Sequence, residues 1–123
     1  MNEPSAKEVT LQEVMPDLLA LAWERLNRLA FNGEMRMPTI EVVPGKESSY
    51  TWNNNGSPGT IRIGAAVADG DYTQALGSSA HVLLHEMAHQ YVAEVKGKYH
   101  AGDGPVFQRE LQAAYERLKG VQQ

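Results

Sequence analysis

Apolar residues recur every three or four positions in three stretches of the chain, a spacing that predicts three amphipathic helices. The first is expected from Pro16 to about Phe31, with Asn32-Gly33 ending it. The second is expected from Ser78 to Lys96, and the third opens at Pro105 and fades after residue 120. The stripes that should face the core are Leu18, Ala22, Leu26 and Leu29; then Leu84, Ala88, Tyr91 and Val95; then Phe107, Leu111, Ala114 and Leu118.

Three short runs rich in β-branched and aromatic residues separate the first two helices and predict strands at Thr39–Val43, Ser49–Trp52 and Thr60–Gly64. The last two runs flank residues 53–59, whose asparagines, glycines and proline are typical of a turn, so a hairpin is expected. The pattern predicts a small three-stranded antiparallel sheet in an α+β protein. Residues 65–77 are expected to form a loop before the second helix, as are the residues from Gly97 to Gly104 after it.

The length of 123 residues fits one domain, which can bury a core but leaves no room for a second domain. Residues 1–9 have no apolar stripe and are expected to be a flexible tail. Residues 10–120 form the expected domain. At its start, Thr10 and Glu13 have the spacing of a capping box.

The second predicted helix contains the string His85-Glu86-Met87-Ala88-His89, which has the pattern H-E-x-x-H. His85 and His89 are one helical turn apart, so both imidazoles leave the same face and can bind one metal ion. Glu86 lies about 100° further round the helix, where its carboxylate can take a proton from a water on that ion. The string therefore predicts a metalloprotease, with Glu86 as the catalytic base. The alternative is a solvated helix face on which these three residues are ordinary surface groups.

A third histidine lies four residues before the motif and complicates this prediction. His81 points to the same side as His85, but it is about 12 Å from His89 along the helix axis. Three such residues cannot bind one ion, and only the pair His85 and His89 fits the motif. His81 is expected on the wall of a cleft or on the surface. Together with Tyr91 and Tyr99 it is a candidate hydrogen-bond donor to the substrate.

A catalytic zinc ion usually has three protein ligands and one open position, so a third ligand is needed. The loop after the second helix contains His100 and Asp103, both of residue types that zinc accepts and both within reach of a returning chain. A further alternative leaves two protein ligands, with Asp103 interacting only with the free amides at the start of the last helix.

The chain resembles the SprT-like zinc metallopeptidases in its N-terminal helix, its sheet, the string His-Glu-Met-Ala-His and the segment Gly102-Asp103-Gly104-Pro105-Val106-Phe107. The resemblance covers most of residues 15–119 and implies a zincin-like fold with Zn²⁺ as cofactor. In that family the second motif reads Gly-His-Gly-Pro-x-Phe, and its histidine is the third zinc ligand. Asp103 stands at that position here, so the resemblance implies Asp103 as the third ligand in preference to His100.

Charge and cysteine content restrict the partners and the metal ligands. A net charge of −4 without a block of Lys or Arg argues against intrinsic nucleic-acid binding. No run approaches the ~18 apolar residues of a membrane span, and the N-terminus does not have the pattern of a signal peptide, so a cytoplasmic protein is expected. The chain has no cysteine, so any metal must be held by His, Asp or Glu.

These observations together predict a zinc-dependent endopeptidase that acts on protein or peptide substrates, with a monomer as the default state. SprT-like proteins are associated with proteolysis near DNA, so DNA-associated and unfolded proteins are the expected substrates. Strand Thr60–Gly64 is expected to hold an extended substrate by edge pairing. The alternative is a non-catalytic, zinc-stabilised protein-binding module in which the changed third ligand has removed turnover. A hydrolase of non-peptide bonds is a third hypothesis. Manganese or cobalt could replace zinc at such ligands.

Overall fold

The computed structural model describes residues 11–65, 72–98 and 102–121. The expected tail at 1–9, Thr10, Tyr99 and His100 lie outside these residues. Along the chain, the elements are α2 (Leu11–Ala30), β1 (Thr39–Val43), β2 (Ser49–Thr51), β3 (Thr60–Gly64), α3 (Tyr72–Gln90), the π-helix η2 (Tyr91–Val95) and α4 (Pro105–Val121). No helix in this part of the chain is both long enough and apolar enough to cross a membrane.

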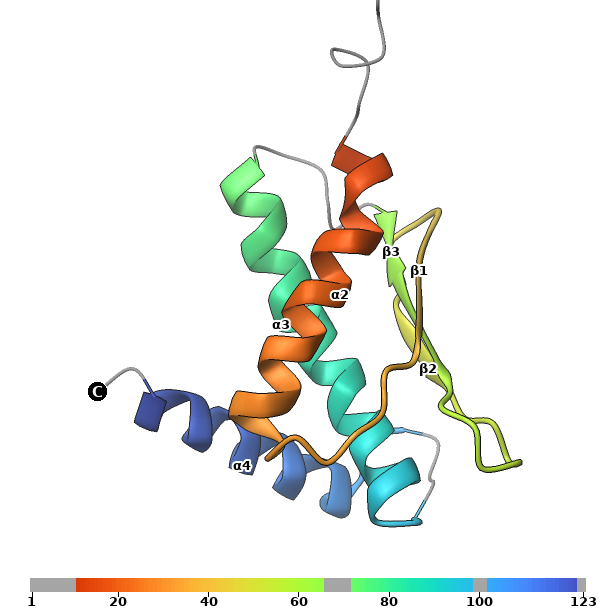
Figure 1. The fold of residues 1–123 in the computed structure, drawn as a ribbon, viewed down its shortest axis with the longest axis vertical. Helices are drawn as coiled ribbons and strands as arrows, with labels where there is room; N and C mark the ends of the chain where they lie inside the picture. The colour runs from red at the N-terminus through yellow and green to blue at the C-terminus, as the bar shows by residue number, and fades with distance from the viewer. Residues whose placement is uncertain (1–10, 66–71, 99–101, 122–123) are drawn as a thin grey trace, which may run out of the picture.

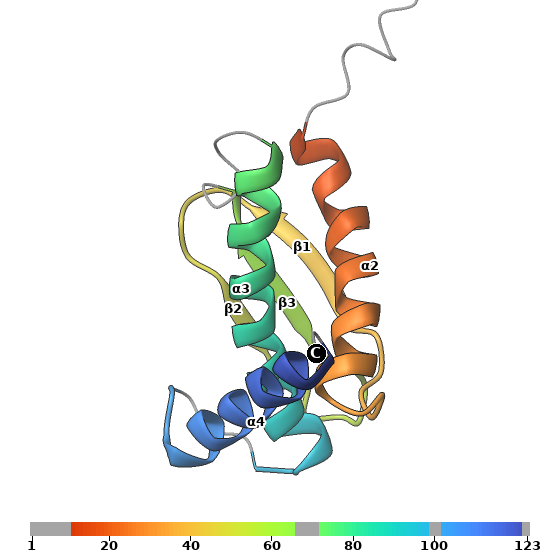
Figure 2. The same cartoon turned by 90° about the vertical axis from the view of Figure 1, so that its left-hand side faces the viewer.

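Helices α2 and α3 form one layer against the three-stranded sheet, and α4 packs on these helices. Helices α2 and α3 run side by side, and the sheet lies along one side of the pair (Figures 1 and 2). Strand β1 contacts α2, whereas β2 and β3 contact α3. Helix α4 crosses the same end of both long helices and closes the core there (Figure 2). The expectation of an α+β fold is confirmed.

The strand order is β1-β3-β2, with β3 antiparallel to β2 and parallel to β1. The hairpin of β2 and β3 is confirmed, but the expectation of a wholly antiparallel sheet was wrong. Strand β3 contributes Ile61 and Ile63, which are at most 1% exposed, and burial on this scale favours the central position. Because β3 is paired on both sides, it has no free edge for a substrate, contrary to expectation. The edge next to α3 belongs to β2.

A close backbone contact fixes the connection between β1 and β2. A Cβ atom added to Gly64 would lie 2.6 Å from the carbonyl carbon of Lys46 and 2.7 Å from the carbonyl oxygen of Gly45. The backbone N–H of Gly64 also donates a hydrogen bond of 3.0 Å to Oγ of Ser48. Glycine is therefore required at the end of β3, where residues 44–48 pack directly on the strand.

Two helices begin earlier than the sequence indicates. Helix α2 starts at Leu11 and includes Pro16, which was expected to mark its start. Because Pro16 has no backbone N–H, it cannot donate a hydrogen bond to the carbonyl of Gln12. Gln12 lies in the first turn of the helix, so only this one hydrogen bond is lost. Helix α3 starts at Tyr72, so the expected start at Ser78 and loop at 65–77 were wrong for residues 72–77. An internal glycine costs a helix only about 1 kcal/mol, and Gly77 therefore does not end it.

A polar network inside the molecule holds the C-terminal end of α3. The side chain of Gln90 is fully buried, accepts a hydrogen bond from Nε1 of Trp23 at 3.0 Å and donates one to the carbonyl of Arg36 at 2.9 Å. Glu94 in η2 accepts hydrogen bonds from the Tyr50 hydroxyl at 2.6 Å and from the Gly59 amide at 2.7 Å. The C-terminal end of α3 and the π-helix η2 are thus tied to α2 and to the sheet.

Candidate metal centre

His85 and His89 leave α3 from the same face, as the sequence predicts. Their ring centroids are 5.2 Å apart, and both Nε2 atoms point toward the start of α4. The side chain of His85 is 39% exposed and that of His89 is 16% exposed. The helix keeps this face beside the core because Leu84, Met87 and Ala88 are buried next to the histidines.

Asp103 completes the group from the other side. Its Oδ1 atom lies 2.9 Å from Nε2 of His89 and 3.6 Å from Nε2 of His85. The chain reaches this position through Gly102, whose φ of +92° is a conformation that few other residues adopt, and α4 begins at Pro105. Oδ1 and the two histidine nitrogens all lie within 4.8 Å of one another.

This donor set fits a divalent ion. Ligands about 2.1 Å from a tetrahedral ion lie about 3.4 Å from each other, close to the 3.6 Å that separates Asp103 and His85. The shorter contact with His89 is a hydrogen bond, which would open by about half an ångström around an ion. Two imidazoles and a carboxylate suit Zn²⁺ and its neighbours in the first transition series.

An aromatic ring from α4 contacts both imidazoles. The ring of Phe107 stacks on His89 with centroids 4.0 Å apart and an interplanar angle of 15°. It also contacts His85 at 4.8 Å in a tilted arrangement. Phe107 is only 3% exposed, so its position is fixed by the core, and the orientation of both histidines is fixed with it. The sequence assigned this residue to the apolar stripe of α4 without indicating its role at the site.

Glu86 is only 7% exposed, although it lines the cleft beside His85. Burial, and to a smaller extent the negative charge of Asp103, raises the pKa of Glu86 to about 7. A carboxylate with this pKa can both accept and release a proton near neutral pH. A cation bound at the nearby cluster would lower this pKa.

The surroundings of His89 favour its neutral form. Burial and the neighbouring His85 lower the pKa of His89, and these effects outweigh the opposing effect of Asp103. A metal ion binds the neutral imidazole, so this shift reduces the competition between protons and metal.

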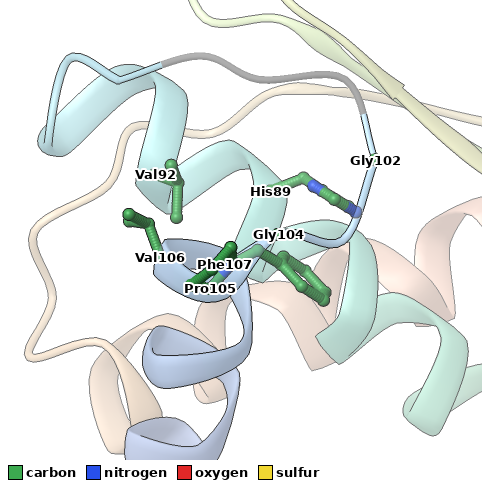
Figure 3. Close-up of a pocket in the computed structure, with 7 residues that line it drawn as sticks. All are labelled: His89, Val92, Gly102, Gly104, Pro105, Val106 and Phe107. Atoms are coloured by element: carbon green, nitrogen blue, oxygen red, sulfur yellow. The ribbon is translucent and has the colours of Figure 1, made fainter.

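The cluster lies between two hollows that share no lining residue within the described part of the chain. One is a polar cleft of about 400 Å³, lined by Lys46, Ser48, His81, Val82, His85, Glu86 and Tyr115. The other is an apolar pocket of about 280 Å³, shown in Figure 3 and lined by His89, Val92, Gly102, Gly104, Pro105, Val106 and Phe107.

The remaining candidates occupy different places. His81 lines the polar cleft, as expected, and its Nδ1 lies 3.3 Å from the hydroxyl of Tyr115. Sequence spacing does not indicate Tyr115, because only the packing of α4 on α3 brings it to the cleft. Tyr91 cannot act as a donor to a substrate there, since it is 4% exposed and its hydroxyl is directed to Glu34. His100 lies outside the described residues, so its role as a ligand stays untested.

Comparison with known proteins gives one informative match. No family model matches the sequence, and no curated protein matches it significantly. Among solved structures, the fold is similar to that of the metallopeptidase zymogen of Pyrococcus abyssi, abylysin, with a TM-score of 0.53 and 19% sequence identity. The alignment covers 84% of this chain and 90% of abylysin. The chain therefore has a fold similar to that of this metallopeptidase zymogen.

Proposed function

We propose that this protein is a zinc-dependent endopeptidase of the SprT-like type. The observation that carries the proposal is the convergence of His85, His89 and Asp103 beside the buried carboxylate of Glu86. The likeness of the fold to a metallopeptidase supports the same reaction. Asp103 then takes the position of the histidine in the family motif and serves as the third ligand.

In the proposed reaction, His85, His89 and Asp103 hold Zn²⁺, which when bound would polarise the scissile carbonyl and acidify a water. Glu86 removes a proton from the attacking water as the new C–O bond forms. The protonated Glu86 then transfers this proton to the leaving amine as the C–N bond breaks. Without an ion the pKa of Glu86 is raised to about 7, and a bound cation would lower it, which favours the ionised carboxylate that accepts the proton in the first step.

The substrate is proposed to be an extended protein segment in the polar cleft. Ser48, at the wall of this cleft, directly precedes the edge strand β2. An extended segment could pair with β2 on the side away from β3, where none of the described strands lies. Unfolded or loosely folded proteins offer such segments, including proteins associated with DNA.

The proposal is tested with the substitution Glu86→Gln. The variant is expected to bind one equivalent of zinc like the wild type, because Glu86 is not a ligand. Its cleavage of denatured casein is expected to fall by at least about 100-fold, the usual contribution of a general base. Metal content by atomic absorption and peptide release by mass spectrometry are the two measurements.

The matched control is Glu116→Gln, on the exposed face of α4, which should retain wild-type turnover. Equal turnover in the Glu86 variant would remove this residue from the mechanism. Bound zinc without cleavage by the wild type would instead favour a zinc-stabilised binding module, which the aspartate at the family's histidine position also suggests.

A further inference from the structure

The polar cleft beside the metal cluster has a lining rich in hydrogen-bond donors. Lys46 and Ser48 line it from the connection between β1 and β2, together with His81 of α3 and Tyr115 of α4. Glu86 is the one acidic side chain among the described residues of this lining, and it is 7% exposed. The reaction proposed above uses Glu86 and the metal ligands, but it assigns no chemistry to the other four residues.

Lys46 brings a positive charge to this cleft. Its side chain is exposed and forms no ion pair with the described residues. Its backbone is fixed, because its carbonyl group packs so closely on Gly64 that a Cβ atom would not fit there. Glu47 follows in the chain but is not among the described residues that line the cleft. An anion in the cleft would therefore meet a cation that the described residues do not neutralise.

The neighbouring polar groups add hydrogen-bond donors. Oγ of Ser48 accepts the hydrogen bond from the Gly64 amide, and its own hydrogen has no acceptor among the described residues. Nδ1 of His81 lies 3.3 Å from the Tyr115 hydroxyl. If Nδ1 accepts this bond, Nε2 carries the ring hydrogen of the neutral imidazole; if Nδ1 donates it, the hydroxyl hydrogen is left over. Either tautomer thus leaves one donor of this pair for a ligand.

This combination of a positive charge and several donors suits a carboxylate. Both oxygens of a carboxylate accept hydrogen bonds, and its charge complements that of Lys46. The amide of a glutamine side chain has one accepting oxygen and no charge. The side chains of lysine and arginine have donors only and would be repelled by Lys46.

We propose that this cleft binds a carboxylate of the substrate through Lys46 and the donors beside it. The carboxylate belongs to an Asp or Glu side chain of the bound segment or to the C-terminus of the peptide. This inference rests on the proposed peptidase function and adds the class of substrate to it.

Matched peptides test the proposal. Zinc-loaded protein is given quenched fluorescent peptides that are amidated at the C-terminus and differ only by Glu or Gln at one position. At one position around the cut, the Glu peptide should have a kcat/KM about three to five times higher, as expected for one exposed charge pair. Lys46→Met should abolish this difference, and Lys46→Arg should retain it. Lys119→Met removes the same charge from an exposed site on α4 and should leave the difference unchanged.

A third peptide, with Gln and a free C-terminal carboxylate, distinguishes the two sources. Faster cleavage of the Glu peptide assigns the site to an acidic side chain, and faster cleavage of the free acid assigns it to the end of the chain. Equal rates for all three peptides would overturn the carboxylate site while leaving the peptidase function intact. A preference that is unchanged in Lys46→Met would do so as well.

A binding measurement separates failure of the carboxylate site from failure of the peptidase function. Metal-free protein is used, because a carboxylate can also bind zinc. It is titrated with N-acetyl-glutamate N-methylamide and, separately, with the glutamine analogue, while amide shifts are followed by NMR. Shifts at Lys46 and Ser48 with the glutamate compound alone, lost in Lys46→Met, support the site even if the zinc-loaded protein cleaves nothing and the peptidase function falls. Equal responses to both compounds, or none at these amides, would overturn it.

Discussion

Glu86 is a carboxyl group that the fold withholds from solvent and yet keeps on the wall of a polar cleft. Leu83 and Met87, which come before and after Glu86 in the same helix, are fully buried and keep this part of the helix against the core. The cost of burying its charge appears as a pKa of about 7, well above the ordinary 4.5. This cost links protonation of the residue to the stability of the whole protein.

In metal-free protein, Glu86 should make stability fall as the pH rises from about 4.5 to 7. In that window the folded state holds a proton on this group that the unfolded chain has already released, so unfolding becomes easier with rising pH. His89 has the opposite sign, since its lowered pKa adds stability as the pH rises toward 6.5. Urea unfolding in EDTA across this range, compared with Glu86→Gln, isolates the contribution of Glu86. An identical pH dependence in both proteins would contradict it.

Asp103 allows a second prediction at a single side chain. An aspartate ligand cancels part of the charge of the ion, so a bound water stays less acidic than with three neutral histidines. Asp103→His should therefore move the acidic limb of the activity profile to lower pH while retaining zinc. Rates between pH 5 and 9 measure this shift, and Asp103→Ala serves as the control, with zinc affinity expected to fall by at least about tenfold. An unchanged or higher optimum in the histidine variant would argue against Asp103 as a ligand.

The sequence predicts part of this site because part of it is local. His85, Glu86 and His89 need only a helix to take their relative positions, and helical spacing is readable from the chain. Asp103 lies 14 residues after His89, so its approach depends on how α4 packs, and spacing alone could not separate it from His100. Tyr115 and Phe107 reach the site only through the same packing.

The bounds of β1 and β3 could be predicted from local sequence, whereas their pairing could not. The bounds of β1 and β3 agree with the prediction, since β-branched residues and the turn residues that flank them act within a few positions. The parallel pairing of β1 with β3 depends on contacts across the sheet, and a strand before a hairpin can join either side of it. The early start of α3 shows that Gly77, Ser78 and Ser79 do not mark a helix boundary here.

Helix α4 carries both core and site residues, which gives a prediction at this scale. Phe107→Ala should reduce the free energy of unfolding by about 3–5 kcal/mol, as expected for a fully buried phenylalanine. It should also weaken zinc binding, because the ring that supports both histidines is lost. Denaturant unfolding and competition with a fluorescent zinc chelator measure the two effects.

The comparison variant is Met15→Ala in α2, where the side chain is 1% exposed and distant in sequence from the cluster. It should cost about 2–5 kcal/mol in stability without a specific change in zinc affinity. If both variants lose zinc affinity equally for a given loss of stability, Phe107 is only a core residue.

For the whole molecule, the proposed ion joins two separate parts of the chain. The ligands come from the end of α3 and from the turn before α4, so a bound ion would resist the separation of these elements. Zinc at 100 times its dissociation constant should add about 2.7 kcal/mol to the free energy of unfolding. Thermal unfolding with zinc and with EDTA measures the difference. An equal melting temperature in both conditions would show that the folded state binds no ion at this concentration.

The order of the three ligands along the chain has a consequence for biosynthesis. A ribosome adds the two histidines and the glutamate before it adds the aspartate and the helix that follows the aspartate. A partly made chain would therefore contain the proposed base but only two of the three proposed metal ligands. It would also lack Phe107, whose ring contacts both histidines. In the proposed enzyme, the full ligand set would therefore exist only after the turn before α4 has folded back onto α3.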